Sequence, residues 1–339
     1  MFTEVGKNVE VVAPAGNLAS LKAAADSGAD SVYAGFRDQT NARNFEGLNF
    51  TDRDIEEGLK YLHQRGKKLY LAINTFPQRD DFQRWQAAVD RAVSFGVDAI
   101  ILADLGVLSY ARSKYPEQEI HLSVQASSSN HESINFYKKH FNIKRVILPR
   151  VVTLEEIRYI HQNTDVELEV FAIGGLCINI EGRCFLSSFV TGASTNTEGA
   201  CSPSRFVEFS TDHGGNLSIK LNGVLLNRLS SGEASPYPTC CKGRYIMPDG
   251  TTAYPIEEPS SLNVLELLPE LIEAGVCAFK IEGRQRTRAY IKEVTRIVSE
   301  AIEEYEKNPH SYRVKEEWLN KAIRTFEGTT QTLACYMEK

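Results

Sequence analysis

The sequence predicts an α/β protein: a TIM-type (β/α)8 barrel with a long cysteine-bearing insertion between its seventh and eighth strands. Three observations lead to this fold. Short apolar runs alternate with segments of helical period through the first 175 residues. The runs are nearly continuous in Val, Ile and Leu, as in parallel strands that are buried on both faces. An eighth unit follows after the insertion, and eight units favour a barrel over a doubly wound sheet, which stays the alternative.

Glycines mark three of the expected junctions between a helix and the next strand. Gly28, Gly96 and Gly275 stand there, where a left-handed C-cap would end the helix. Helical segments between the strands include DRDIEEGLKYLHQRG, DFQRWQAAVDRAVSFG and LEEIRYIHQN. The strands are expected at residues 9–13, 31–35, 68–73, 98–103, 119–124, 145–149, 167–173 and 277–283.

The connection between the seventh and eighth strands is far longer than the few residues usual in such folds. Residues 176–276 form it, and they are rich in Gly, Ser, Thr, Asn and Pro. One strand is predicted at 218–227, and one helical segment in SSLNVLELLPELIEAG. The chain therefore divides into a barrel domain of residues 1–305, which carries this inserted layer, and a C-terminal extension of residues 306–339, expected as a short helix and a loose tail.

Composition limits the classes of function. The chain of 339 residues has 42% hydrophobic and 24% charged residues, and its net charge is −6. This balance predicts no nucleic-acid partner, because the whole chain lacks a basic footprint, although a local basic site stays open. The first residues lack the basic and apolar regions of a signal peptide, and no run approaches the roughly 18 apolar residues that span a bilayer. We therefore expect a cytoplasmic protein without stable membrane insertion.

Five of the seven cysteines lie close together in the insertion. In a reducing compartment, clustered cysteines are more often ligands or catalysts than disulfides. Structural zinc sites usually show short C-x2–4-C pairs, which this spacing lacks, whereas a 4Fe–4S cluster needs only four thiolates that reach it. An iron–sulfur cluster, a zinc site and buried or redox thiols all stay open on spacing alone. The five residues are Cys177, Cys184, Cys201, Cys240 and Cys241.

The other two cysteines, and one of the adjacent pair, are expected to have no part in a metal site. Cys240 and Cys241 would point in opposite directions in an extended segment, so one of them faces away. Cys277 begins a predicted strand and is expected to be a core residue. Cys335 lies in the tail.

Residues 169–187, EVFAIGGLCINIEGRCFLS, resemble the signature of the collagenase-like peptidase family. Gly175 is a mild departure, since Ser or Ala is usual there, and Ala13 replaces a cysteine that many members have. The resemblance extends over residues 9–305. It includes APAGN at 13–17, TNARNFEGLNF at 40–50, LSVQA at 122–126, LPR at 148–150, GACSP at 199–203, CKGR at 241–244, EPSSL at 258–262 and KIEGRQ at 280–285.

The resemblance is strongest to a branch that acts in O2-independent ubiquinone biosynthesis. It implies a 4Fe–4S cluster as cofactor, a heterodimer with a UbiV-like paralogue, a prenylated aromatic ubiquinone precursor as substrate and prephenate as apparent hydroxyl donor. It places the cluster ligands on Cys177, Cys184, Cys201 and Cys241. The last is chosen over Cys240 because it immediately precedes Lys-Gly-Arg.

Three other functions stay open. Further branches of the family imply hydroxylation of RNA bases by the same chemistry. The older family name suggests a peptidase, but the sequence has neither H-E-x-x-H nor G-x-S-x-G. The third is a non-catalytic scaffold, in which the cluster only staples the insertion.

Residues just after the predicted strands are expected to project into the mouth of the barrel, where such folds place their chemistry. Because guanidinium groups suit carboxylates, we expect Arg43, Arg150 or Arg284 to contact an anionic substrate or donor; the alternative is an ordinary solvated or ion-paired arginine. Glu282 is a weaker candidate for catalysis. The residues at the strand ends are Asn17, Asn74, Asp104, Gln125, Arg150, Glu282 and Arg284.

Overall fold

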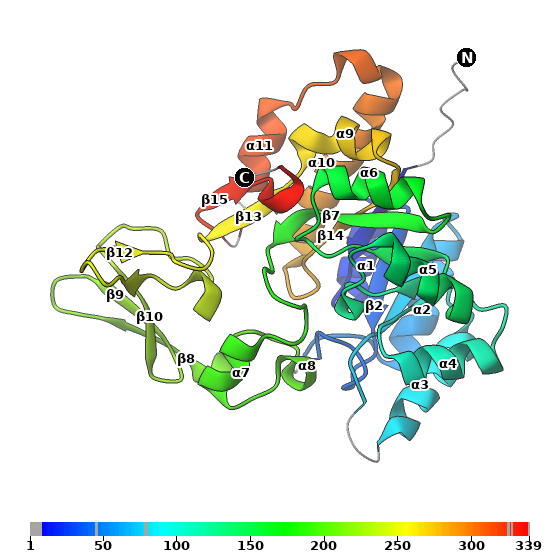
Figure 1. Ribbon diagram of the computed structural model, residues 1–339, viewed down its shortest axis with the longest axis horizontal. Coiled ribbons are helices and arrows are strands. Elements are labelled where there is room, and N and C mark those ends of the chain that lie inside the picture. Colours follow the sequence, from blue (N-terminus) through cyan, green and yellow to red (C-terminus); the bar gives the residue numbers. More distant parts are fainter. Residues whose placement is uncertain (1–8, 45–46, 78–80, 324–325, 327, 338–339) are drawn as a thin grey trace.

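Eight parallel strands close into a barrel in the computed structural model of the chain (Figure 1). Each strand pairs with the next along the chain, and the last strand pairs with both the first and the seventh, which closes the sheet. The predicted barrel is therefore confirmed. The strands are β1 (Glu10–Pro14), β2 (Ser31–Gly35), β3 (Lys68–Ile73), β4 (Ala99–Leu102), β5 (Ile120–Leu122), β6 (Arg145–Ile147), β7 (Glu167–Gly175) and β14 (Val276–Ile281).

The structure describes residues 9–44, 47–77, 81–323, 326 and 328–337. Outside this part lie residues 1–8 and 78–80 of the predicted barrel domain, residues 45–46 of the TNARNFEGLNF motif, and residues 324–325, 327 and 338–339 of the predicted extension. No helix in the described part is both long enough and apolar enough to cross a membrane.

Helices follow the strands and cover the outside of the barrel. Thr51 and Thr153 begin two of them with capping boxes, in which the threonine and the acidic residue three positions later exchange hydrogen bonds. The three predicted junction glycines all have positive φ, with 100° at Gly28, 75° at Gly96 and 95° at Gly275. The helices are α1 (Leu18–Ala25), α2 (Asp52–His63), α3 (Phe82–Phe95), α4 (Leu105–Lys114), α5 (His131–Phe141), α6 (Leu154–Gln162), α9 (Leu268–Glu273) and α10 (Arg288–Lys307).

The insertion after β7 is a layer of short elements that projects from the barrel on the left of Figure 1. The single strand predicted at 218–227 is wrong, because the chain turns back at Asn222 and Gly223. Both residues have positive φ, 47° and 78°, as a two-residue hairpin turn requires. The layer contains α7 (Phe185–Thr191), α8 (Thr195–Glu198), β8 (Val207–Thr211), β9 (Leu217–Leu221), β10 (Val224–Leu229), β11 (Tyr245–Ile246) and β12 (Thr252–Ala253).

The end of the chain packs on the barrel, so the expected loose tail is wrong. β13 (Ser260–Asn263), which lies where a helix was predicted, runs antiparallel to β7, and β15 (Thr330–Thr332) pairs with β13. Trp318 in α11 (Glu316–Ile323) is fully buried. Tyr336 is also buried, and its hydroxyl donates a hydrogen bond to the carbonyl of Phe171 in β7. Burial of large aromatic side chains outweighs the polar composition of this segment.

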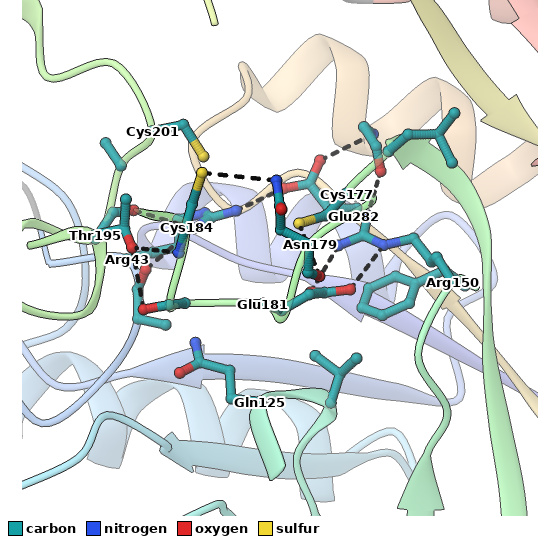
Figure 2. Close-up of a pocket in the computed structure, with 18 of the residues that line it drawn as sticks. Arg43, Gln125, Arg150, Cys177, Asn179, Glu181, Cys184, Thr195, Cys201 and Glu282 are labelled. Carbon is teal, nitrogen blue, oxygen red and sulfur yellow. Dashed lines mark hydrogen bonds and ion pairs between the residues drawn. The ribbon is translucent and has the colours of Figure 1, made fainter. Parts of the chain in front are cut away.

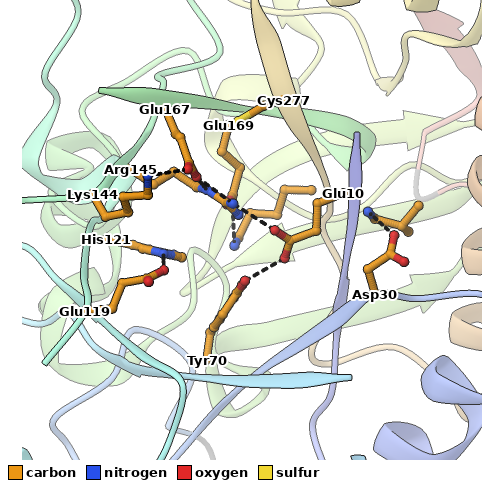
Figure 3. A network of polar contacts seen from close by, with 12 residues as sticks. Glu10, Asp30, Tyr70, Glu119, His121, Lys144, Arg145, Glu167, Glu169 and Cys277 are labelled. Atoms are coloured by element: carbon orange, nitrogen blue, oxygen red, sulfur yellow. Dashed lines mark hydrogen bonds and ion pairs between the residues drawn. The ribbon is translucent and has the colours of Figure 1, made fainter. Parts of the chain in front are cut away.

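A network of charged side chains fills part of the barrel interior near the amino ends of the strands (Figure 3). Arg145 of β6 lies 2.7 Å from Glu10, 2.8 Å from Glu167 and 3.3 Å from Glu169. Lys280 of β14 lies 2.7 Å from Glu169, which has no exposed surface. Two buried cations therefore hold three carboxylates, which satisfies the rule that buried charges are paired.

Replacing Glu10 with glutamine is expected to lower the free energy of unfolding at neutral pH by roughly 3 kcal/mol. Burial alone would raise the pKa of Glu10, but Arg145 outweighs burial and lowers it to about 2. A lowered pKa means that the carboxylate stabilises the fold fully above its ordinary pKa of 4.5, and that this contribution is lost as the pH falls toward 2. Urea denaturation should therefore show the difference between the two proteins shrinking over that range.

Glu57→Gln is the matched control for this experiment. Glu57 pairs with Lys22 at 2.7 Å, but its side chain is 49% exposed, so the change should stay within about 0.5 kcal/mol at every pH. A difference between wild type and Glu10→Gln that stays constant from neutral pH to pH 3 would contradict the pairing with Arg145.

Candidate functional site

A pocket lies between the carboxyl ends of the barrel strands and the insertion (Figure 2). Its floor comes from the strands, and its outer wall from the insertion and from the loops that follow β2, β3, β5, β6 and β14. This is the face where barrels of this kind carry their chemistry. Six residues, one from each of six strands, line the floor: Tyr33, Ala72, Ile101, Ile147, Phe171 and Lys280.

The insertion brings five cysteines to the wall of this pocket, and all of them are free thiols. Cys177 lies in the loop after β7, Cys184 caps the start of α7, and Cys201 follows α8. Cys240 and Cys241 begin a short 3-10 helix, η3 (Cys240–Lys242). Figure 2 shows Cys177, Cys184 and Cys201 around one space, although they come from different turns of the chain.

The adjacent pair does not lie in the extended segment that was expected. Side chains one position apart in a 3-10 helix still point in different directions, since three residues make a turn. Cys240 is 6% exposed and packs in a small apolar cluster with Leu221 and Leu226. Cys241 is more exposed, and its thiol lies 3.5 Å from the hydroxyl oxygen of Thr239. The geometry thus gives Cys240 a packing role in the insertion.

The loop between Cys177 and Cys184 is held in place by polar contacts. The amide of Asn179 donates to the sulfur of Cys184 at 3.7 Å, and the thiol of Cys177 lies 3.5 Å from the carbonyl of Asn179. Gly182 has a φ of 75°, and a Cβ there would stand 2.5 Å from the Gln125 side-chain oxygen. Glycine is required at this position for both reasons.

Arg150, at the end of β6, clamps the same loop. Its Nε and Nη2 lie 3.0 and 2.8 Å from the two carboxylate oxygens of Glu181, which is the paired geometry that guanidinium groups favour. It also donates to the carbonyl of Gly175, and its guanidinium lies 4.1 Å from the centre of the Phe171 ring. The charge of Arg150 is therefore already matched by a carboxylate within the protein.

Burial raises the pKa of several of these cysteine thiols. Burial raises the pKa of Cys177 to about 11 and that of Cys201 to about 12. Burial also raises the pKa of Cys241. A metal that binds such thiols displaces their protons. The cations near the resulting thiolates therefore affect the stability of the bound metal.

The donor set suits a cluster better than a single metal ion. In the described part of the chain, no three His, Cys, Asp or Glu side chains converge closely enough to hold one ion. A zinc ion needs its ligands about 2.0–2.3 Å from a single point, whereas the four cysteines of a 4Fe–4S cluster bind an extended group. Free thiols spaced around one pocket therefore fit a cluster.

Five cations line the pocket, and they differ in whether a carboxylate balances them. Arg150 pairs with Glu181 and Lys280 with Glu169. A third, Arg43, lies 3.6 Å from Glu282 and donates to the carbonyl of Gly199 at 3.0 Å. The two others have no carboxylate within ion-pair distance among the described residues. They are Lys242 and Arg284.

Of these two cations, Arg284 lies on the barrel side of the pocket. It is 4% exposed, and it donates hydrogen bonds to the amide oxygens of Asn41 at 3.1 Å and Asn49 at 3.4 Å. Burial lowers the pKa of Arg284 to about 10, and Tyr33 and Glu282 only partly oppose that lowering. By contrast, burial would raise the pKa of Glu282, but Arg43 and Arg150 hold it below the ordinary value.

Five of the seven expected strand-end residues line the pocket, namely Asn74, Gln125, Arg150, Glu282 and Arg284. Asn17 and Asp104 do not, because they cap the amino ends of α1 and α4 with their side-chain oxygens. Sequence reasoning missed Glu181 and Lys242. The only signal for Lys242 was its place after Cys241 in CKGR.

A family model described as peptidase family U32 matches residues 16–339. The chain belongs to peptidase family U32. The resemblance that residues 169–187 indicated is thereby confirmed at the level of the family. The U32 chain is 35% identical over 321 residues to a Methanocaldococcus jannaschii protein named uncharacterized protease MJ0090, and this match covers 93% of the chain and 70% of that protein.

A second relative carries a different name. The U32 chain is 30% identical over 336 residues to tRNA hydroxylation protein P1 of Bacillus subtilis, with 96% of the chain and 72% of that protein covered. Among solved structures, the U32 peptidase Mk0906 covers 85% of the chain and 98% of its own length at a TM-score of 0.51 and 12% identity. At this identity the likeness concerns the fold, which is again the closed barrel.

Proposed function

We propose that this chain is the 4Fe–4S component of an O2-independent hydroxylase in ubiquinone biosynthesis, as UbiU is, and that it acts with a UbiV-like paralogue. The observation that carries the proposal is the meeting of free cysteines from separate segments of the insertion at the wall of the barrel pocket. The hydroxylation named in the Bacillus subtilis relative supports the class of reaction. The UbiU-like role rests on the motifs of the sequence.

Cys177, Cys184, Cys201 and Cys241 would hold the cluster, which supplies electron transfer or a Lewis acid when bound. The protein's own residues provide the surroundings. Arg150 and Glu181 fix the loop that carries the first two cysteines. Ala72, Ile101, Ile147 and Phe171 offer an apolar floor for an aromatic ring.

Prephenate, the proposed hydroxyl donor, is a dicarboxylate, and two arginines of the pocket suit its carboxylates. Arg284 is a buried cation without a carboxylate partner among the described residues, so an anionic ligand there would restore the missing charge balance. Arg43 is 33% exposed, and its distance of 3.6 Å from Glu282 leaves its guanidinium able to reach a second carboxylate. Arg150 is the weakest of the three, since Glu181 already binds it.

Anaerobic purification with and without the paralogue tests the proposal. Iron, acid-labile sulfide and visible absorption should reveal about one four-iron cluster in each chain. The loaded pair should then hydroxylate a prenylated aromatic precursor when labelled prephenate is supplied without O2. Zinc in place of iron, or a cluster-loaded pair that leaves the precursor unchanged, would refute it.

Hydroxylation of RNA bases is the second candidate, and the name of the Bacillus subtilis relative favours it. The same loaded protein should be offered a tRNA fragment in parallel with the quinone precursor. A peptidase role has less support, because no histidine is among the described residues that line the pocket. His121 lies instead in the barrel wall against Tyr70 and Glu119.

Arg284→Met is expected to weaken binding of prephenate by about tenfold or more, because a hydrogen bond to a charged group contributes roughly 1.5–3 kcal/mol. Isothermal titration calorimetry on anaerobic protein measures this directly. Arg228→Met is the control, since Arg228 is 64% exposed on the insertion and pairs with Asp212. Equal affinities for wild type and Arg284→Met would remove Arg284 from the donor site.

A further inference from the structure

Lys242 is a buried cation on the insertion side of the pocket, and its charge is not balanced within the described part of the chain. It is 5% exposed and lines the pocket directly after Cys241. Its ammonium group donates a hydrogen bond to the carbonyl oxygen of Ser260 in β13, at 2.8 Å. A carbonyl accepts a hydrogen bond but does not neutralise a charge, and buried ammonium groups are costly without a counter-ion.

The surroundings of Lys242 hold its position from two sides. Its backbone carbonyl accepts a hydrogen bond from the amide of Asn227, which is fully buried in β10. Its side chain reaches across to β13, which pairs with barrel strand β7. The ammonium group therefore has a fixed place between the insertion and the barrel, beside the short helix that carries Cys241.

Lys242 follows Cys241 directly in η3, and its ammonium group is held at β13 beside that helix. An iron–sulfur cluster with its four thiolates is an anionic group, and its reduction potential depends on nearby charge, hydrogen bonds to sulfur and exposure to solvent.

We propose that Lys242 is the counter-cation of the cluster and that it raises the reduction potential of the cluster from its position next to the Cys241 ligand. This inference rests on the proposed function, because it requires the cluster. Reduction adds negative charge to the cluster, so a fixed positive charge nearby stabilises the reduced form and raises the potential. Lys242 is a positioning residue in this role, since it acts through the cluster and not on the substrate.

A simpler role would be structural, with Lys242 only tying η3 to β13 through the Ser260 carbonyl. Three variants separate charge from tether. Lys242→Gln keeps a hydrogen-bond donor without charge, Lys242→Met removes both, and Lys242→Arg keeps both. Lys220→Met is the matched control, because Lys220 lies on β9 of the same insertion and does not line the pocket.

The experiment is a redox titration of the cluster followed by EPR on the anaerobically purified pair. Iron and sulfide are counted first for each variant. We expect full clusters throughout, a lower midpoint potential in both Lys242→Gln and Lys242→Met, and a potential near that of the wild type in Lys242→Arg and Lys220→Met.

Other outcomes overturn the inference. An unchanged potential in Lys242→Met, or a wild-type potential in Lys242→Gln, would show that charge at this position does not act on the cluster. Loss of the cluster from Lys242→Arg as well as from the neutral variants would make the residue purely structural. A wild-type protein that binds no iron refutes the proposed function itself. That result differs from a cluster-loaded protein in which the Lys242 variants leave the potential unchanged, which refutes only the role of Lys242.

Discussion

Alanine in place of any one of Cys177, Cys184, Cys201 or Cys241 is expected to abolish the iron–sulfur cluster and, with it, hydroxylation. The four thiols approach the pocket from separate turns of the insertion. Cys240, the fifth cysteine of the described lining, packs with Leu221 and Leu226, so we expect no thiol to replace a missing ligand. The binding free energy of a metal centre also contributes to the folding of the segments that hold it. We therefore expect loss of iron and sulfide, loss of the visible absorption band and faster proteolysis within the insertion.

The three remaining cysteines supply matched controls. Cys277 in β14 lies 3.5 Å from the carbonyl of Leu168 on the neighbouring strand, on the side of the charged network and away from the pocket lining. Cys335 lies in the short helix η6 (Ala334–Tyr336). Alanine at either position should leave the iron content unchanged.

Cys240→Ala is the most demanding control, because Cys240 also lines the pocket. Its packing with Leu221 and Leu226 predicts a loss of about 1 kcal/mol in stability, with the cluster retained. A cluster lost from Cys240→Ala but kept in Cys241→Ala would reverse the choice of ligand within the pair. Iron retained in all four ligand variants would show that these cysteines do not hold the cluster.

The barrel was predictable because its strands are buried on both faces, which leaves continuous apolar runs that are independent of distant contacts. The junction glycines could be predicted for a similar local reason, since a left-handed C-cap selects glycine. The hairpin at Asn222 and Gly223 also has a local signal, an Asn-Gly pair between apolar runs, and it was overlooked. The strand β13 had no such signal, because its pairing with β7 and β15 depends on residues far away in the chain.

The candidate site was predictable in its residue types but not in its charge balance. The sequence identifies the cysteines and three arginines, yet it does not reveal which cations already have a carboxylate. Arg150 forms an ion pair with Glu181, which lies in a loop 31 positions further along the chain. Lys242 and Arg284 become distinct only when the pocket is assembled, because no carboxylate of the described residues pairs with either of them. Ion pairing is a tertiary property, so composition and spacing do not report it.

Arg145→Met is expected to be the most destabilising change outside the cysteines. Arg145 is 5% exposed and contacts three carboxylates, those of Glu10, Glu167 and Glu169. Removing one partner of a buried ion pair costs about 3–5 kcal/mol because the remaining charge is left unpaired, and here three charges lose a partner. Urea denaturation should show a large drop in the midpoint, with the variant accumulating poorly at 37 °C.

The double variant Glu10→Gln/Arg145→Met separates loss of charge pairing from loss of packing. If unpaired carboxylates cause the instability, the double variant should be less destabilised than the two single changes added together, by about 1 kcal/mol or more. Additive effects would instead point to the volume of the arginine stem.

The effect of Arg145→Met should also reach the pocket, because Glu169 links the two. Glu169 is fully buried and binds both Arg145 and Lys280, and the ammonium group of Lys280 lines the pocket floor 3.9 Å from the centre of the Tyr33 ring. Without Arg145, Lys280 is the ion-pair partner that Glu169 keeps among the described residues, so we expect the ammonium group to move closer to that carboxylate. Weaker ligand binding in an Arg145→Met protein with a full cluster would demonstrate this coupling. Unchanged binding would mean that the charged network contributes to stability only.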